Sequence, residues 1–165
     1  MNTNKRIDPR GPRFSAAITA VLLLVVIGLA LATPLGTTIS QRSTEPAFVF
    51  FAALVTLFAW GAFAGVQRHP YGLIFRSLVR PRLSAPAELE DPVPPTFAQG
   101  VGFTITLVGA ILHLVGVPLA LVVAAGAAFV AAFLNAAFDY CLGCQIYLLL
   151  VRTGILGRKK GAAAA

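Results

Sequence analysis

Four long apolar runs limit the folds that are open to this sequence. Each run holds about 20 residues with almost no charge, which is the length that an α-helix needs to cross a bilayer. Segments such as VLLLVVIGLALA and LVVAAGAAFVAAFL do not alternate apolar and polar residues, which disfavours the strands of a membrane barrel. Only 12% of the residues are charged, against about 25% in soluble domains. We therefore expect an all-α, polytopic membrane four-helix bundle.

The runs place the spans at approximately residues 14–35, 47–66, 97–117 and 119–138, within one membrane domain over residues 14–156. The first run is longer than the core of a signal peptide, which favours its retention. Basic side chains prevail in residues 1–13 and in the tail, residues 157–165, so we expect both termini in the cytoplasm and the protein in the bacterial plasma membrane. The terminal GAAAA is typical of a cloning scar and is set aside.

The longest polar connection, from Arg68 to Pro95, separates the second and third spans. Within it, residues 71–79 are too few to cross a membrane and predict a short interfacial helix. Arg76 and Arg80 lie near one face of that helix, where a solvated basic anchor is favoured over a site for anionic lipid or a partner. The prolines between residues 81 and 95 then predict a stiff, extended link.

The last apolar stretch, from Leu119 to Val151, is too long for one crossing. As one straight helix it would extend about 50 Å, against a hydrocarbon core of about 30 Å. We expect the fourth span to end or bend between Asn135 and Gly143, and an interfacial helix to follow at residues 146–156. Small residues recur at every fourth position of this span and predict close packing against a neighbouring helix: Ala124, Ala128, Ala132 and Ala136.

The chain's two cysteines, Cys141 and Cys144, lie three residues apart where this break is expected. That spacing brings two sulfurs within reach of a disulfide, and Gly143 would loosen the backbone between them. If a helix begins just after Cys141, its free amides favour the thiolate there, so Cys141 would be the nucleophile and Cys144 the resolving residue. The alternative is that both cysteines are small packing residues in a membrane helix.

Asp139 precedes the cysteines, and an ionisable side chain at that depth is a candidate functional residue. It suits proton exchange with the departing thiol, pairing with Arg152 or capping of the following turn. His113 lies near the far end of the third span and is interpreted as a packing or hydrogen-bonded residue. Because other ligands are sparse, we expect neither zinc nor haem and predict no cofactor.

Several motifs resemble a family of small bacterial membrane proteins of unknown activity, found mainly in actinobacteria. They are Asp8-Pro9-Arg10, Arg13-Phe14, His69-Pro70-Tyr71 and, above all, the segment from Asp139 to Cys144 with its CxGC motif, followed by Tyr147. The resemblance extends from Asp8 to about Gly154. Such proteins are encoded in many genomes beside thioredoxin-like or rhodanese-like proteins, which implies a part in thiol or sulfur transfer.

Two functions fit these features, and the sequence does not decide whether the chain is an enzyme. The first is a membrane-held dithiol that exchanges electrons or sulfane sulfur with a soluble thioredoxin-like or rhodanese-like partner, resting as the dithiol in the reducing cytosol. The second is a non-catalytic structural subunit that packs against a larger membrane complex through the alanine face of the fourth span. A passage for a small sulfur anion is a third option, although spans one to three offer few polar residues.

Nucleic acid is not an expected partner. The net charge of +7 would raise that question for a soluble chain. Here the basic residues lie between apolar runs, where retention in the cytosol explains them, and no surface motif combines aromatic with basic residues. The lipid bilayer is therefore the primary expected partner.

Overall fold

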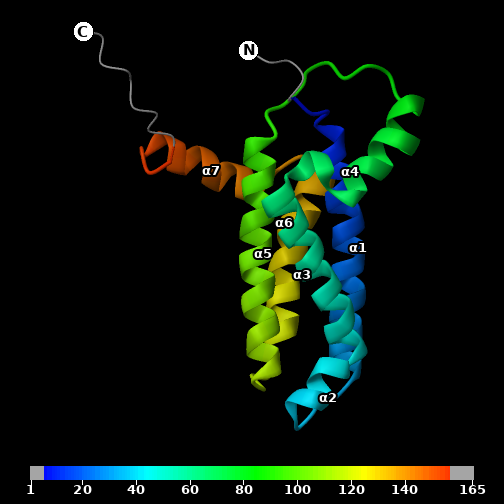
Figure 1. Cartoon of the computed structure of the whole chain (residues 1–165), viewed down its shortest axis with the longest axis vertical. Coiled ribbons are helices and arrows are strands. Elements are labelled where there is room, and N and C mark those ends of the chain that lie inside the picture. The colour runs from blue at the N-terminus through cyan, green and yellow to red at the C-terminus, as the bar shows by residue number, and fades with distance from the viewer. Residues whose placement is uncertain (1–5, 157–165) are drawn as a thin grey trace.

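The computed structural model describes residues 6–156, and within them the chain is helical and contains no β-strand. Four of its helices are long and apolar enough to cross a membrane: α1 (Arg10–Ala32), α3 (Pro46–Ala64), α5 (Val93–Leu114) and α6 (Ala120–Phe138). They lie side by side as a bundle (Figure 1). The predicted all-α membrane bundle is confirmed, and the chain is a multi-pass membrane protein. The basic tail predicted at residues 157–165 lies outside the described residues.

Shorter helices mark the two ends of the bundle (Figure 1). At one end, which we call the hairpin end, lie α2 (Ile39–Thr44) and the turn at residues 115–119 between α5 and α6. The opposite end, which we call the cysteine end, carries η2 (Val66–Arg68), α4 (Pro70–Ile74), η3 (Phe75–Val79), η4 (Arg80–Arg82) and α7 (Leu142–Arg152). α1 begins at the cysteine end.

The alanine face of α6 is buried against other helices of the same chain. A Cβ atom added at Gly109 of α5 would lie 2.1 Å from the Ala124 Cβ, so these two helices touch through their smallest residues. Ala128 is only 4% exposed and belongs to a core cluster with Leu23 and Val26 of α1. The predicted close packing is therefore confirmed at Ala124 and Ala128, and this half of the face is used within the chain, whereas Ala132 and Ala136 are only half-buried.

Two spans begin earlier than the apolar runs indicate. α1 starts at Arg10, four residues ahead of the predicted span, where the Asp8 carboxylate accepts a hydrogen bond of 3.0 Å from the Arg10 amide. α5 starts at Val93, and Pro94 and Pro95 occupy its first turn, where a missing amide leaves no partner unsatisfied. These two prolines therefore belong to a helix and not to the extended link that was expected.

The last apolar stretch is broken within the predicted interval. α6 ends at Phe138, and Asp139 adopts a left-handed conformation with φ of 58°. The Tyr140 amide then donates to the Leu134 carbonyl at 3.2 Å, which closes the end of the helix. α7 leaves the bundle at a steep angle (Figure 1) and begins at Leu142, earlier than the expected residue 146. Both cysteines therefore border its first turn.

The connection between α3 and α5 is helical from Pro70 to Arg82 and is anchored by Phe75. The Phe75 ring is 3% exposed and lies 5.7 Å from the Phe14 ring, between ring centroids. A Cβ at Gly11 would approach this ring to 3.3 Å, so α1 accepts Phe75 through a glycine. Docking in this way places Arg76 and Arg80 at the wall of a cavity, and both side chains stay exposed, which agrees with the expected basic position in solvent.

Candidate functional site

The two cysteines lie at the start of α7 and are joined by a disulfide, with their Cα atoms 5.2 Å apart. Cys141 is the N-cap of α7, and its Sγ accepts a hydrogen bond of 3.3 Å from the Cys144 amide. The condition set by the sequence, a helix that begins just after Cys141, is therefore met. The amides of this first turn favour negative charge on the Cys141 sulfur. Both residues are half-buried, so neither is sealed in the core.

Gly143 between the cysteines permits close contact between α7 and α5. A Cβ at this position would lie 2.5 Å from the Ala98 Cβ. One turn further along α7, the Tyr147 ring lies 5.5 Å from the Phe97 ring, between centroids. The sequence suggested that this glycine loosens the backbone, whereas the structure shows that it seats α7 on the start of α5.

Asp139 is fastened to α1. Its Oδ2 lies 3.5 Å from Arg13 Nη1, and Arg13 Nη2 donates to the Ala136 carbonyl at 3.4 Å. The expected pairing with Arg152 is therefore wrong, and Cys141, not Asp139, caps the following helix. The Asp139 side chain is 58% exposed and holds the end of α6 against α1. Proton exchange between Asp139 and a cysteine is not tested by this arrangement, in which Arg13 pairs with the carboxylate.

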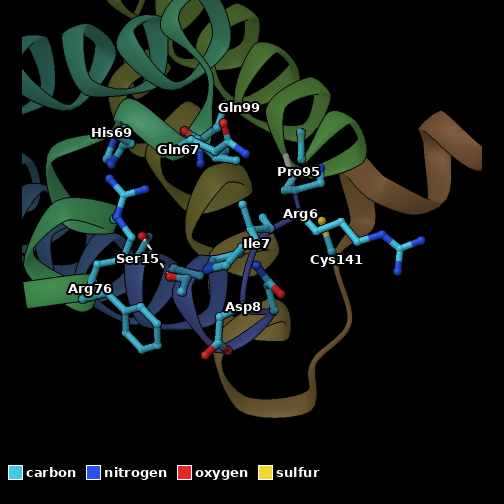
Figure 2. Close-up of a pocket in the computed structure, with 18 of the residues that line it drawn as sticks. Arg6, Ile7, Asp8, Ser15, Gln67, His69, Arg76, Pro95, Gln99 and Cys141 are labelled. Carbon is cyan, nitrogen blue, oxygen red and sulfur yellow. Dashed lines mark hydrogen bonds between the residues drawn. The ribbon is translucent and has the colours of Figure 1, made fainter. Parts of the chain in front are cut away.

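A cavity of about 430 Å³ lies at the cysteine end and has Cys141 in its wall (Figure 2). It is enclosed by the starts of α1 and α5, the end of α6 and the segment from η2 to η4. Figure 2 shows Cys141 and Arg6 on one side of the lining, with Arg76 and His69 on the other. The polar side chains that also line it are Ser15, Gln67, Gln99 and Asn135.

The cavity is positively charged. Its described basic residues are Arg6, Arg76 and Arg80, and Asp8 is the one acid among its described lining residues. Arg10 Nε and Nη2 donate to the two carboxylate oxygens of Asp8 at 2.9 and 2.7 Å, and Arg80 Nε lies 4.0 Å away. The hydrogen bonds from Arg10 hold the pKa of Asp8 below its usual range. Because Asp8 is already neutralised, positive charge remains for a ligand.

His69 contributes a neutral imidazole to the wall. Its Nδ1 accepts a hydrogen bond of 3.3 Å from the Tyr71 amide, which caps α4 and places the ring proton on Nε2. The residue is 4% exposed, and burial lowers its pKa. The ring also forms a hydrogen bond with the Leu57 backbone, so His69 is an uncharged wall residue whose polar atoms are used within the protein.

The segment before α1 is tied to the linker before α5 at the cavity wall. Ile7 and Glu90 exchange two backbone hydrogen bonds of 2.9 Å, and Arg10 Nη2 donates to the Ser84 carbonyl at 3.0 Å. Burial, together with the nearby charge of Asp139, raises the pKa of Glu90. This backbone bridge holds Ile7 and Leu89 against the cavity.

Sequence reasoning did not identify the cavity or several of its polar residues. Ser15 and Gln99 are polar positions in otherwise apolar helices, and that contrast was the available signal. Asn135 entered the sequence analysis only as one end of the interval in which the fourth span was expected to end. Within residues 6–156, no group of three His, Cys, Asp or Glu side chains could hold a metal ion.

Comparison with known protein families gives a match, whereas comparison with curated proteins and with solved structures finds none. A family profile described as a domain of unknown function, DUF4395, matches residues 7–152. That range includes the four long helices, both cysteines and every lining residue of the cavity except Arg6. The chain therefore belongs to the DUF4395 family.

Proposed function

We propose that this protein is a membrane-held dithiol that exchanges electrons or sulfane sulfur with a soluble thioredoxin-like or rhodanese-like partner. The position of Cys141 is the observation that carries the proposal: it is a helix N-cap in the wall of a polar cavity. Two packing cysteines inside a membrane helix would have neither feature. The half-buried sulfurs leave room for a partner to approach.

The electron transfer is an ordinary thiol–disulfide exchange. In the reduced protein, the Cys141 thiolate attacks the disulfide of the partner, so that a mixed disulfide forms and one partner thiolate leaves. The Cys144 thiolate then attacks the Cys141 sulfur and releases the partner as a dithiol. Two electrons pass from the membrane protein to the partner, and the product is the Cys141–Cys144 disulfide that the structure contains.

Sulfane transfer uses the same two residues. The Cys141 thiolate attacks the outer sulfur of a partner persulfide, which forms a persulfide on Cys141 and releases the partner thiolate. Cys144 then attacks the Cys141 sulfur, which releases hydrogen sulfide and forms the disulfide. In both reactions the helix N-terminus favours Cys141 as the attacking thiolate.

The distribution of charge supports a cytoplasmic position for the cysteine end in the plasma membrane. Arginines concentrate in the segments of this end: Arg6, Arg10, Arg13, Arg68, Arg76, Arg80, Arg82 and Arg152. Arg42 stands alone among the residues from 33 to 45 that contribute to the hairpin end. Basic residues flanking short membrane spans are retained in the cytosol, so the cysteines would meet soluble cytoplasmic partners.

Trapping of the mixed disulfide tests the proposal. The Cys144→Ser variant, reduced and held in nanodiscs, is mixed with an oxidised thioredoxin, and a covalent complex through Cys141 is expected. The matched Cys141→Ser variant should give at most about one tenth as much complex, because its remaining thiol lacks the N-cap position. Absence of a complex from both variants, with equal amounts of folded protein, would contradict the proposal.

A structural-subunit role would need a surface other than the one first considered. Ala128 is buried between helices of this chain, so Ala128→Leu would disrupt the bundle itself. Loss of assembly in that variant would therefore not indicate a missing partner.

A further inference from the structure

We infer that the cavity at the cysteine end binds a low-molecular-weight anionic thiol and directs its sulfur to Cys141. This inference rests on the proposed thiol exchange and names a small substrate for the same site. The lining places positive charge and hydrogen-bonding groups beside a disulfide sulfur. A ligand that is to react there must carry a nucleophilic sulfur, and the charge of the walls selects an anion.

Arg76 is the side chain that best fits an anion-binding role. Arg10 is bound to Asp8, and Arg80 lies within 4.0 Å of the same carboxylate. Arg76 lies exposed at the cavity wall and makes no hydrogen bond or ion pair with any residue in the described part of the chain. Its guanidinium can therefore form two parallel hydrogen bonds with a carboxylate or sulfonate.

The polar side chains and the volume of the cavity suit an organic ligand that is long enough to reach from Arg76 to Cys141. Within residues 6–156, the side-chain amides of Gln99 and Asn135 have no hydrogen-bond partner, yet both line the cavity. Figure 2 shows Arg76 and Cys141 on opposite sides of the lining, with Gln99 at its top. The volume of about 430 Å³ lies in the range that holds small organic ligands. An anionic group at Arg76 and a thiol at Cys141 would span this space.

The reaction balances with two molecules of the small thiol. The first thiolate attacks the Cys141 sulfur, so that a mixed disulfide forms, the Cys141–Cys144 bond breaks and Cys144 leaves as a thiolate. A second thiolate attacks the small-molecule sulfur of that mixed disulfide and releases the Cys141 thiolate. The protein gains two electrons as a dithiol, and the two small thiols leave as their disulfide.

Glutathione and its dimethyl ester form a matched pair of probes, because they share the thiol and the skeleton but differ in their carboxylates. The oxidised protein is held in phosphatidylcholine nanodiscs, and the rate at which free cysteine thiols appear is measured. Each rate is divided by the concentration of thiolate in the probe. We expect glutathione to react about fivefold faster than the ester, which is the scale of one charge contact that solvent still reaches. In Arg76→Gln the two rates should become nearly equal. The control Arg152→Gln, which loses the same charge outside the cavity, should keep the preference.

S-methylglutathione keeps the carboxylates of glutathione but has no free thiol, so it can bind in the cavity without reacting. It should inhibit the glutathione reaction of the wild-type protein and fail to inhibit that of Arg76→Gln. Equal rates for glutathione and its ester in the wild-type protein would overturn this inference and leave the exchange with a soluble partner standing. A disulfide that resists every thiol, thioredoxin included, would overturn both. A preference that disappears in phosphatidylglycerol nanodiscs would identify a lipid headgroup as the occupant and would also overturn the inference.

Discussion

At the hairpin end, Arg42 donates to three backbone carbonyls, whereas at the cysteine end Arg76 has no partner in the part of the chain that the structure describes. The Arg42 bonds, of 2.7 to 2.9 Å, reach Gly36, Thr37 and Leu114. They join the loop before α2 to the end of α5. Two arginines in one bundle therefore have different uses, one holding the backbone and the other bordering a cavity.

The acidic and imidazole groups follow the same division. Glu45 accepts a hydrogen bond of 2.8 Å from the Gly36 amide, and its other carboxylate oxygen lies 3.2 Å from His113 Nε2. The His113 ring stacks on Phe48, which agrees with its interpretation as a packing residue. The hairpin end is thus a set of polar groups that face one another. The cysteine end, in contrast, directs polar groups toward an open space, as a binding site requires.

Removal of Arg42 should have the largest effect on stability. Arg42→Gln removes charged donors from three backbone carbonyls, and we expect the free energy of unfolding to fall by about 2–4 kcal/mol. Arg76→Gln should change it by less than about 0.5 kcal/mol, because Arg76 is exposed and has no hydrogen bond or ion pair to lose within the described residues. Denaturation of both variants in one detergent measures the difference. Similar losses in the two variants would remove the distinction between the ends.

Gly143→Ala tests whether the cysteine pair depends on the docking of α7. The added methyl group would overlap Ala98, so α7 must move away from α5. We expect the free energy of local opening to fall by about 1–3 kcal/mol, as measured by amide hydrogen exchange over α7. Gly126→Ala is the matched control, since nothing lies within 4 Å of the new Cβ. Unchanged protection of α7 in Gly143→Ala would show that this contact does not hold the helix.

Asp8 should make the cysteine end less stable at low pH. Its pKa in the folded protein lies below the ordinary value of 3.8, so its contribution is complete above that value and is lost as the pH falls through the folded pKa. We expect Asp8→Asn to lose about 1–2 kcal/mol at pH 7, because Arg10 and Arg80 stay partly exposed and stabilise it less than a sealed pair would. Thermal unfolding from pH 7 to pH 3 should show a smaller decline in the variant.

Glu90 should have the opposite effect to Asp8 on the pH dependence of stability, because its pKa is raised and that of Asp8 is lowered. Its raised pKa means that its ionisation opposes folding, so the stability that it contributes at low pH is lost as the pH rises through the folded pKa. Glu90→Gln should therefore be slightly more stable than the wild-type protein at pH 7. A loss of stability in that variant would contradict this assignment.

The ion pair of Asp139 should have the smallest effect. Asp139→Asn keeps a residue that tolerates the left-handed conformation and removes only an exposed pair with Arg13, at a cost of less than about 1 kcal/mol. We expect the rate of disulfide exchange to change less than about threefold, because the carboxylate is already bound to Arg13 and proton transfer by a positioned acid contributes about a hundredfold or more. A hundredfold slower exchange would identify Asp139 as the proton donor.

The sequence predicted those features of the fold that depend on the thickness of a bilayer, namely the number of spans and the break in the last apolar stretch. A stretch as long as residues 119–151 cannot cross once, so the break before Cys141 followed from length alone. The starts of α1 and α5 could not be read in this way, because Asp8 and the prolines of the first turn extend the helices beyond the apolar runs.

The cavity could not be predicted, because it is assembled from segments far apart in the chain. Ser15, Arg76 and Asn135 come from three different elements, and no local pattern relates them. The pairing of Asp139 with Arg13 likewise joins opposite ends of the sequence. Sequence spacing identified the pair of cysteines as the candidate site, whereas the tertiary structure supplied the charged surface beside it.

Labelling with a membrane-impermeant maleimide tests the central claim, that the break between α6 and α7 leaves the two sulfurs reachable from the edge of the membrane. Inside-out and right-side-out vesicles are treated before and after mild reduction. We expect Cys141 and Cys144 to react only after reduction and only in inside-out vesicles, since the disulfide must open and the cysteine end should face the cytoplasm. Absence of labelling in both orientations after complete reduction would show that the sulfurs are sealed in the bilayer and would contradict the account.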